Sequence, residues 1–422
     1  MRKPFAILAG VMILLVMVAP PAHASEQPPL EAKQLPSAVA LDTLETRRIA
    51  DDCATVRPRL PELARAAAKE GTTSVACIKP TEPGTPRARK ADPTLLFEPF
   101  PLWCTDVPGS WVYTLETREM ICAVRDLTLD VINVNTGAII GQIYFDEYAF
   151  EYTSSTIPTF AYQIMIDMYG GWGSIGGTLA QGTATCTGAC TVNSSDFLPQ
   201  AVTTTNQVEG EAFFRSTATT RGSVGTATAT WSYYFVNPSW VAPSTPVTVT
   251  PPVTRCDHNL PGNNTVAGCI IRDIPPAMIY SVSSAYEELA WHILAAQDSG
   301  LPGSHPSYGL SHPAPLNRLV NAAQQTSNYN RSCPSSYPRP AGLSCDEYPF
   351  QSSQQGAATG GGGPGRTFGG CQVPLPAGTG PSGYSACMID NTQNSEGGSA
   401  LGSFYIDQRI FNADPFYVWI TP

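Results

Sequence analysis

Hydrophobic and polar residues alternate along much of the first half of the chain. The period of two is clear from Leu127 to Ile132 and again from Thr226 to Tyr234. Such alternation predicts half-buried β-strands, and turn signals such as Asn135-Thr136-Gly137 separate the runs. Short strands at regular spacing favour two packed sheets. We therefore predict an all-β sandwich of about seven or more strands over residues 103–240.

The pattern after residue 256 is mixed. Apolar positions from Tyr286 to Gln297 favour an amphipathic helix, and Ser284 with Glu287 has the sequence of a capping box. Shorter helices are expected at 316–325 and 399–407. The apolar run from Phe416 to Ile420 predicts a buried closing strand. A small α+β domain is therefore expected to follow the β-sandwich.

Composition sets the remaining boundaries. The Pro/Thr-rich stretch before residue 256 favours an extended linker. Residues 25–102 have frequent prolines and balanced charges, with helices expected at 41–52 and 61–69; they are interpreted as a weakly ordered pro-segment or spacer. The predicted organisation is a signal peptide (1–24), a lead-in (25–102), a β-sandwich (103–240), a linker (241–255) and a C-terminal domain (256–422).

The N-terminus has the features of a secretory signal peptide. Arg2 and Lys3 precede an apolar run from Phe5 to Ala19, and a small-x-small cleavage site ends at Ala24. That run is short for a membrane span, and no later segment is apolar enough to cross a bilayer. The mature protein is therefore expected to be secreted, without a membrane anchor, and monomeric.

The cysteines agree with an exported protein, because disulfides persist in oxidising compartments. The chain has 12 cysteines, and they fall into close neighbours along the sequence. Spacing cannot determine connectivity. Pairing of neighbours is our working hypothesis, since it leaves no free thiol. The expected pairs are 53–77, 104–122, 186–190, 256–269, 333–345 and 371–387.

The charge of the chain limits how it could bind a polyanion. The formal net charge is −10, charged residues make up 14% of the sequence, and no lysine follows residue 256. Binding of nucleic acid by overall surface charge is therefore disfavoured. A local site in which a bound cation contacts phosphate remains compatible with this composition.

The stretch from Cys345 to Phe350 is the strongest candidate for chemistry. Asp346 and Glu347 are adjacent carboxylates between a cysteine, which can anchor the segment, and Pro349, which must end regular strand pairing. Carboxylates at a rigid strand end are well placed to act as an acid or base, because catalysis is sensitive to position. A solvated strand end is the alternative interpretation of this pair.

This stretch and the residues after it resemble the NucA/NucB-type deoxyribonucleases, which are secreted, metal-dependent, non-specific endonucleases. The matching pieces are Asp346-Glu347-Tyr348-Pro349, Asn394-x-x-Gly-Gly-Ser, and the closing apolar strand. The resemblance implies a small domain of the ββα-metal type, in which a β-hairpin and a helix hold one divalent ion.

The resemblance also implies residue roles. Asp346 takes the place of the general base, and Asn394 matches the metal-binding asparagine. Glu347 is a candidate metal ligand, or it orients water or an arginine. The implied cofactor is Mg²⁺ or Mn²⁺, and the implied substrate is DNA. Arg409 either contacts the scissile phosphate or forms an ordinary salt bridge.

The sequence departs from the family pattern at Ser395, where an arginine commonly follows the metal asparagine. Arg366 or Arg409 could replace its phosphate contact. His292 is expected to be packed in its helix, whereas His305 and His312 are the fallback if Asp346 is not the base.

Two other functions stay open, the first because of the departure at residue 395 and the acidic balance of the C-terminal domain, the second because the lead-in and β domain could deliver a nuclease. One is a non-catalytic envelope or glycan-binding protein with a degenerate nuclease domain. The other is a secreted nuclease toxin with an immunity or inhibitor protein as its partner.

Overall fold

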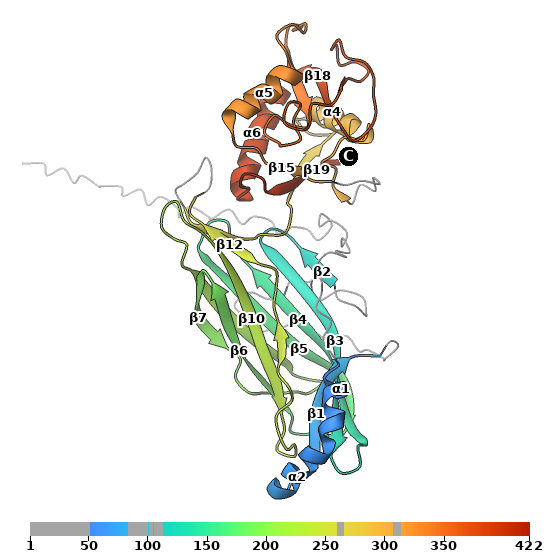
Figure 1. Cartoon of the computed structure of the whole chain (residues 1–422), viewed down its shortest axis with the longest axis vertical. Coiled ribbons are helices and arrows are strands. Elements are labelled where there is room, and N and C mark those ends of the chain that lie inside the picture. The colour runs from blue at the N-terminus through green and yellow to red at the C-terminus, as the bar shows by residue number, and fades with distance from the viewer. Residues whose placement is uncertain (1–50, 83–99, 101–103, 105–112, 260–265, 307–313) are drawn as a thin grey trace, which may run out of the picture. The chain divides into compact units, whose positions relative to one another are not determined.

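The computed structural model describes residues 51–82, 100, 104, 113–259, 266–306 and 314–422 (Figure 1). The signal peptide predicted at 1–24, almost all of the helix predicted at 41–52, and His312 lie outside the described residues. Among the described residues, no helix is long and apolar enough to span a bilayer.

Most of the first half of the chain forms two antiparallel sheets (Figure 1). The first has seven strands in the order β1-β3-β4-β5-β9-β7, and β2 pairs with β3. Its strands are β1 (Ser74–Pro80), β2 (Tyr113–Glu116), β3 (Met120–Asn133), β4 (Ile139–Tyr152), β5 (Thr159–Gly173), β7 (Cys190–Asp196) and β9 (Gln207–Ser216). The second has six strands in the order β13-β12-β10-β6-β8, and β11 pairs with β10. Its strands are β6 (Leu179–Gly188), β8 (Gln200–Ala201), β10 (Val224–Val236), β11 (Val247–Val249), β12 (Thr254–Asp257) and β13 (Gly268–Ile271).

The two sheets share one hydrophobic core. Phe145 of β4 packs against Phe235 of β10 with 5.3 Å between ring centroids. Trp231 of β10 donates from Nε1 to the carbonyl of Tyr162 on β5 at 3.0 Å. Every second residue of β10 is buried from Ala227 to Phe235. Two sheets packed over this alternating strand confirm the predicted layered β architecture.

The described part of the predicted lead-in is more ordered than its composition suggests. It contains α1 (Asp52–Val56), a 3-10 turn (Arg57–Arg59) and α2 (Leu60–Glu70), which lies close to the helix predicted at 61–69. Strand β1 then pairs with β3 along its whole length. Its residues are buried from Ser74 to Ile78, so they belong to the first sheet.

The predicted linker also contributes to the β region. Strand β11 lies within 241–255 and pairs with β10, and its residues are alternately buried and exposed. The next strand, β12, pairs with both β10 and β13, and Cys256 lies directly opposite Cys269. The Val-Thr-Val segment thus forms a strand although prolines surround it. The second sheet consequently extends to Ile271, beyond the boundary predicted at residue 256.

The described residues of the C-terminal region form two small sheets and the α-helices α4, α5 and α6 (Figure 1). One sheet has the order β14-β19-β15, with β14 parallel to β19, and the other has the order β16-β18-β17. The helices α4 and α6 pack into one core with β19. The elements are β14 (Ala277–Ser281), α4 (Glu287–Asp298), β15 (Leu316–Asn317), α5 (Ala322–Ser332), β16 (Leu343–Tyr348), β17 (Gly365–Arg366), β18 (Tyr384–Asp390), α6 (Asn391–Asp407) and β19 (Pro415–Thr421).

Two helix starts differ from the predictions. The predicted capping box is absent: α4 begins at Glu287 after Tyr286, and Ser284 Oγ donates to the carbonyl of Ser281 at 2.7 Å. The helix expected at 316–325 is replaced by the short strand β15 followed by α5. That helix begins after Asn321, whose side chain accepts from Gln324 N. The predicted closing strand is confirmed as β19.

All six disulfides join the cysteines that are neighbours in the sequence, as hypothesised. The pair 186–190 spans the connection between β6 and β7, which belong to different sheets, and the pair 333–345 connects the end of α5 to β16. This last bond anchors the strand that carries the two adjacent carboxylates.

Candidate active site

Strand β16 holds Asp346 and Glu347 in a paired and buried position. In the antiparallel ladder with β18, Asp346 lies opposite Cys387 and Glu347 opposite Ala386. The pairing ends at Tyr348, immediately before Pro349, as expected from the loss of a backbone donor. The two carboxylate residues are 5% and 8% exposed. They are therefore held by the sheet and are not a solvated strand end.

Helix α6 brings the asparagines to the same place. It follows β18 without a loop, because Asp390 caps it by accepting from the backbone N–H groups of Thr392 and Gln393. The helix thus starts at Asn391, well before the start predicted at 399. Gly397 lies in its interior, where a Cβ would collide with Leu289 of α4. Glycine at this position allows α6 to pack closely against α4 while presenting Asn394 near β16.

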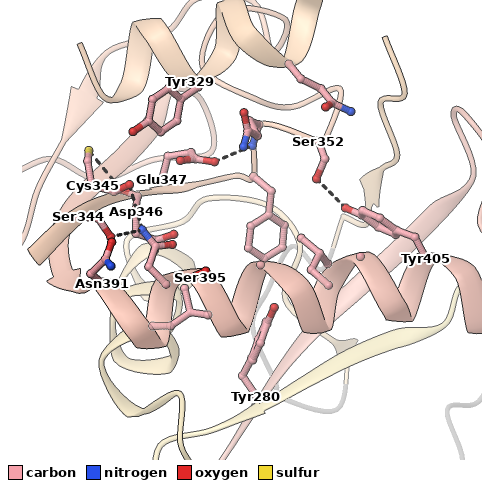
Figure 2. A pocket seen from close by; sticks show the side chains of 18 of the residues that line it. Tyr280, Tyr329, Ser344, Cys345, Asp346, Glu347, Ser352, Asn391, Ser395 and Tyr405 are labelled. Carbon is pink, nitrogen blue, oxygen red and sulfur yellow. Dashed lines mark hydrogen bonds between the residues drawn. The ribbon is translucent and has the colours of Figure 1, made fainter. Parts of the chain in front are cut away.

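Asp346, Glu347 and Asn394 line one pocket with a volume of about 530 Å³ (Figure 2). Their elements are β16 and the first turns of α6, so residues almost fifty positions apart converge. Figure 2 shows the labelled carboxylates close to Ser344 and above the helix that carries Ser395. The pocket is lined by both polar and apolar side chains. The remaining lining residues are Tyr280, Leu289, Arg318, Gln325, Tyr329, Ser344, Cys345, Phe350, Gln351, Ser352, Asn391, Ser395, Gly398, Leu401, Gly402 and Tyr405.

The environment of Glu347 favours its neutral form when no cation is bound. Burial raises the pKa of its carboxyl group to about 8, the charge of neighbouring Asp346 acts in the same direction, and a hydrogen bond from Gln351 N opposes them. That bond is 3.0 Å long and ends on Oε1. Two adjacent buried carboxylates repel each other when both are ionised. A bound cation would relieve this repulsion.

Asn394 is oriented by its neighbours. Its Nδ2 donates to Ser344 Oγ at 2.9 Å and to the carbonyl oxygen of Cys345 at 3.2 Å. Because both partners engage the amide nitrogen, the amide oxygen is the atom left to bind a ligand in the pocket. A carboxylate and an amide oxygen are the hard ligands that Mg²⁺ and Mn²⁺ accept in proteins.

Arg409 lies elsewhere. Arg409 is 1% exposed. Its guanidinium donates from Nε to Asp257 Oδ2 at 3.0 Å and from Nη1 to the carbonyl of Ser155 at 2.7 Å. It is not among the pocket-lining residues. Arg366 is also engaged, since its Nη1 donates to the carbonyls of Ser299 and Gly380. Neither arginine is therefore placed to make the phosphate contact of the family arginine that Ser395 replaces.

Arg318 is an arginine at the pocket that the sequence pattern did not single out. It lines the pocket, its guanidinium carbon lies 4.5 Å from the ring centroid of Tyr405, and Nη1 donates to the carbonyl of Ile410. Partial burial lowers its pKa from the ordinary value for arginine. In the sequence, Arg318 is a single positive charge among the apolar residues Leu316, Leu319 and Val320. The helix predicted at 316–325 does not indicate which way this side chain points.

The histidines differ in their surroundings. His292 is buried on the packed side of α4, as expected, and also contacts Asp346, which sequence spacing could not indicate. His305 stacks on Trp419 with 4.9 Å between ring centroids, and burial lowers its pKa. The described residues contain one cluster of three potential metal ligands, Cys53, Cys77 and Asp130, and its cysteines form a disulfide.

Comparison with known families assigns the region that contains the pocket. The family model described as Deoxyribonuclease NucA/NucB matches residues 311–419. The match includes Arg318, Asp346, Glu347 and Asn394, whereas His292 and the β region precede it. No curated protein and no solved structure matches the chain. The resemblance noted in the sequence is therefore confirmed for the C-terminal region.

Proposed function

We propose that the C-terminal region is a divalent-metal-dependent endonuclease that hydrolyses phosphodiester bonds of DNA outside the cell. The observation that carries this proposal is the convergence of Asp346, Glu347 and Asn394 on one pocket inside the segment that matches the nuclease family. The six disulfides favour an oxidising compartment, which agrees with an extracellular substrate.

The pocket residues divide the chemistry among them. Asp346 accepts a proton from the attacking water, whose oxygen bonds to phosphorus while the bond to the leaving oxygen breaks. Glu347 and Asn394 would hold the divalent ion, since a carboxylate and an amide oxygen are suitable ligands for it. A bound ion of this kind neutralises charge on the phosphate and supplies water that can protonate the leaving oxygen.

The test of this function is cleavage of plasmid DNA by the purified full-length chain in Mg²⁺ or Mn²⁺. We expect nicking and fragmentation with either ion, and none after EDTA treatment until the ion is restored. Glu347→Gln should raise the ion concentration needed for half-maximal rate, because it removes a charged ligand. Cleavage that persists in EDTA, or the absence of cleavage with every divalent ion, would contradict the proposal.

Arg318 takes the phosphate-binding role that the family pattern assigns to an arginine after the metal asparagine. Stacking on Tyr405 and the bond to the Ile410 carbonyl hold its guanidinium at the pocket. A guanidinium in this position can form charge-assisted hydrogen bonds with a phosphate. Because Arg318 supplies a positive charge at the pocket, the lack of an arginine at residue 395 is a weaker argument for a degenerate nuclease.

Arg318→Gln should therefore lower kcat/KM for DNA by about 10- to 100-fold, the effect of losing one hydrogen bond between charged groups. The dependence of KM on salt should also become shallower, by about one unit in the log–log slope. Steady-state assays over a range of NaCl concentrations measure both effects. The matched control is Arg339→Gln, since Arg339 is exposed and lies outside the pocket lining. Equal losses in the two variants would exclude a specific role for Arg318.

A further inference from the structure

A buried contact between His292 and Asp346 has no role in the proposed hydrolysis. His292 Nδ1 lies 2.5 Å from Asp346 Oδ2, and its Nε2 lies 3.0 Å from Ser385 Oγ. His292 is 3% exposed and Ser385 is fully buried. The histidine comes from α4 and the serine from β18, so three separate segments meet at this contact. His292 is not among the residues that line the pocket.

The imidazole ring is held in a single orientation. Ser385 Oγ also donates to the carbonyl oxygen of Tyr348 at 3.4 Å, so the serine that contacts Nε2 is itself held in place by β16. With both ring nitrogens bonded, rotation of the ring would break both contacts. Phe368 packs against the same ring at a centroid distance of 6.1 Å. The nitrogen that faces Asp346 is thereby determined by the packing of α4 on the sheet.

We infer that His292 is a positioning residue for Asp346, an inference that rests on the proposed role of Asp346 as the base. The imidazole engages Oδ2, so Oδ1 is the carboxylate oxygen left to accept a proton in the pocket. A carboxylate with only one fixed end can rotate about its terminal bond, and loss of alignment reduces the rate of proton transfer. Glu347 has no such contact with the ring; its Oε1 is bound by Gln351 N.

A purely structural role, in which the contact only attaches α4 to β16, gives different expectations. Loss of a structural contact lowers the unfolding temperature, and the activity of each variant then falls in proportion to the fraction of protein that is unfolded. Loss of positioning lowers kcat while KM for DNA stays constant, because His292 does not touch the substrate. It should also be repaired by a side chain with an N–H at the place of Nδ1. Asparagine offers such a group, whereas glutamine places its amide near Nε2 and leucine offers none.

The experiment compares His292→Leu, His292→Asn and His292→Gln in the full-length chain, with steady-state cleavage of DNA and thermal unfolding measured for each. We expect His292→Leu to lower kcat by about 10- to 100-fold, as is typical for residues that orient a reactive group, with KM unchanged. His292→Asn should recover most of kcat and His292→Gln should not. The matched control is His258→Asn, because His258 Nδ1 contacts only the backbone carbonyl of Thr219 in the β region. Its kcat should equal that of the unmodified chain.

Ser385→Ala keeps the inference testable if leucine at 292 prevents folding. It leaves the contact with Asp346 in place but frees the ring at Nε2, and kcat should fall by about 2- to 10-fold. An unchanged kcat in folded His292→Leu, or losses in all three variants that follow their unfolding temperatures, would overturn the positioning role alone, provided that Asp346→Asn is inactive. If the unmodified chain does not cleave DNA, or Asp346→Asn cleaves it normally, the proposed function fails and this inference fails with it.

Discussion

Asp346→Asn should reduce the rate of DNA cleavage by about 10²- to 10⁴-fold, the range contributed by a general base. The substitution keeps the size of the side chain and the position opposite Cys387, but an amide cannot accept the proton of the attacking water. Because Asp346 does not supply the charge that binds DNA, KM should change little. Single-turnover cleavage of a labelled duplex at saturating Mg²⁺ measures this step directly.

The interpretation of the Asp346 result depends on folding, because Asp346 is buried and bonded to His292. Circular dichroism and the unfolding temperature should show that the variant is folded under assay conditions. The matched control is Asp407→Asn, since Asp407 is exposed at the end of α6 and outside the pocket lining. A folded Asp346→Asn protein with normal activity would falsify the assignment of Asp346 as the base.

Arg409→Met should destabilise the folded chain by about 3–5 kcal/mol, the usual cost of removing one partner of a buried ion pair. Arg409 makes charge-assisted hydrogen bonds to Asp257, whose side chain is fully buried. Methionine fills much of the space but leaves the carboxylate of Asp257 without its main cationic partner. Chemical denaturation with urea, followed by circular dichroism, measures the loss.

The same variant separates the two interpretations of Arg409 that the sequence left open. If Arg409 is structural, kcat/KM per folded molecule should remain unchanged, and Arg409→Met combined with Asp257→Leu should regain much of the stability, because no unpaired charge remains. A stable Arg409→Met protein with a large loss of cleavage would instead support a contact between Arg409 and the scissile phosphate. Assays at a temperature where the variant is folded distinguish these outcomes.

The predictions that the structure confirms depend on local patterns. Strand β10 was predictable because an alternation of period two requires one buried face, and every second residue from Ala227 to Phe235 is indeed buried. The cysteines pair with their neighbours in the sequence, as the working hypothesis had it. The Asp346-Glu347 and Asn394 motifs carried the family resemblance, which the match over residues 311–419 confirms.

The boundaries that were missed depend on partners far away in the sequence. The alternating residues of β11 pair with β10, and β1 pairs with β3, so segments that looked like a linker and a loose lead-in became strands. Local composition was rich in proline in both places. Pairing with an existing sheet satisfies the backbone hydrogen bonds of these segments, and this gain is invisible in a short sequence window.

The sequence by itself determined the chemical identity of the candidate site: two adjacent carboxylates, an asparagine and a nuclease-like motif order. Only the tertiary structure decided which other side chains join them. Arg318 reaches the pocket directly after β15, where it forms a bridge with Ser353, and His292 reaches Asp346 through the packing of α4. Arg409 is bound to Asp257 and lies outside the pocket lining. The physical reason is that an ion pair or a buried hydrogen bond depends on distance in space, and sequence spacing predicts that distance only within one helix, strand or short disulfide loop.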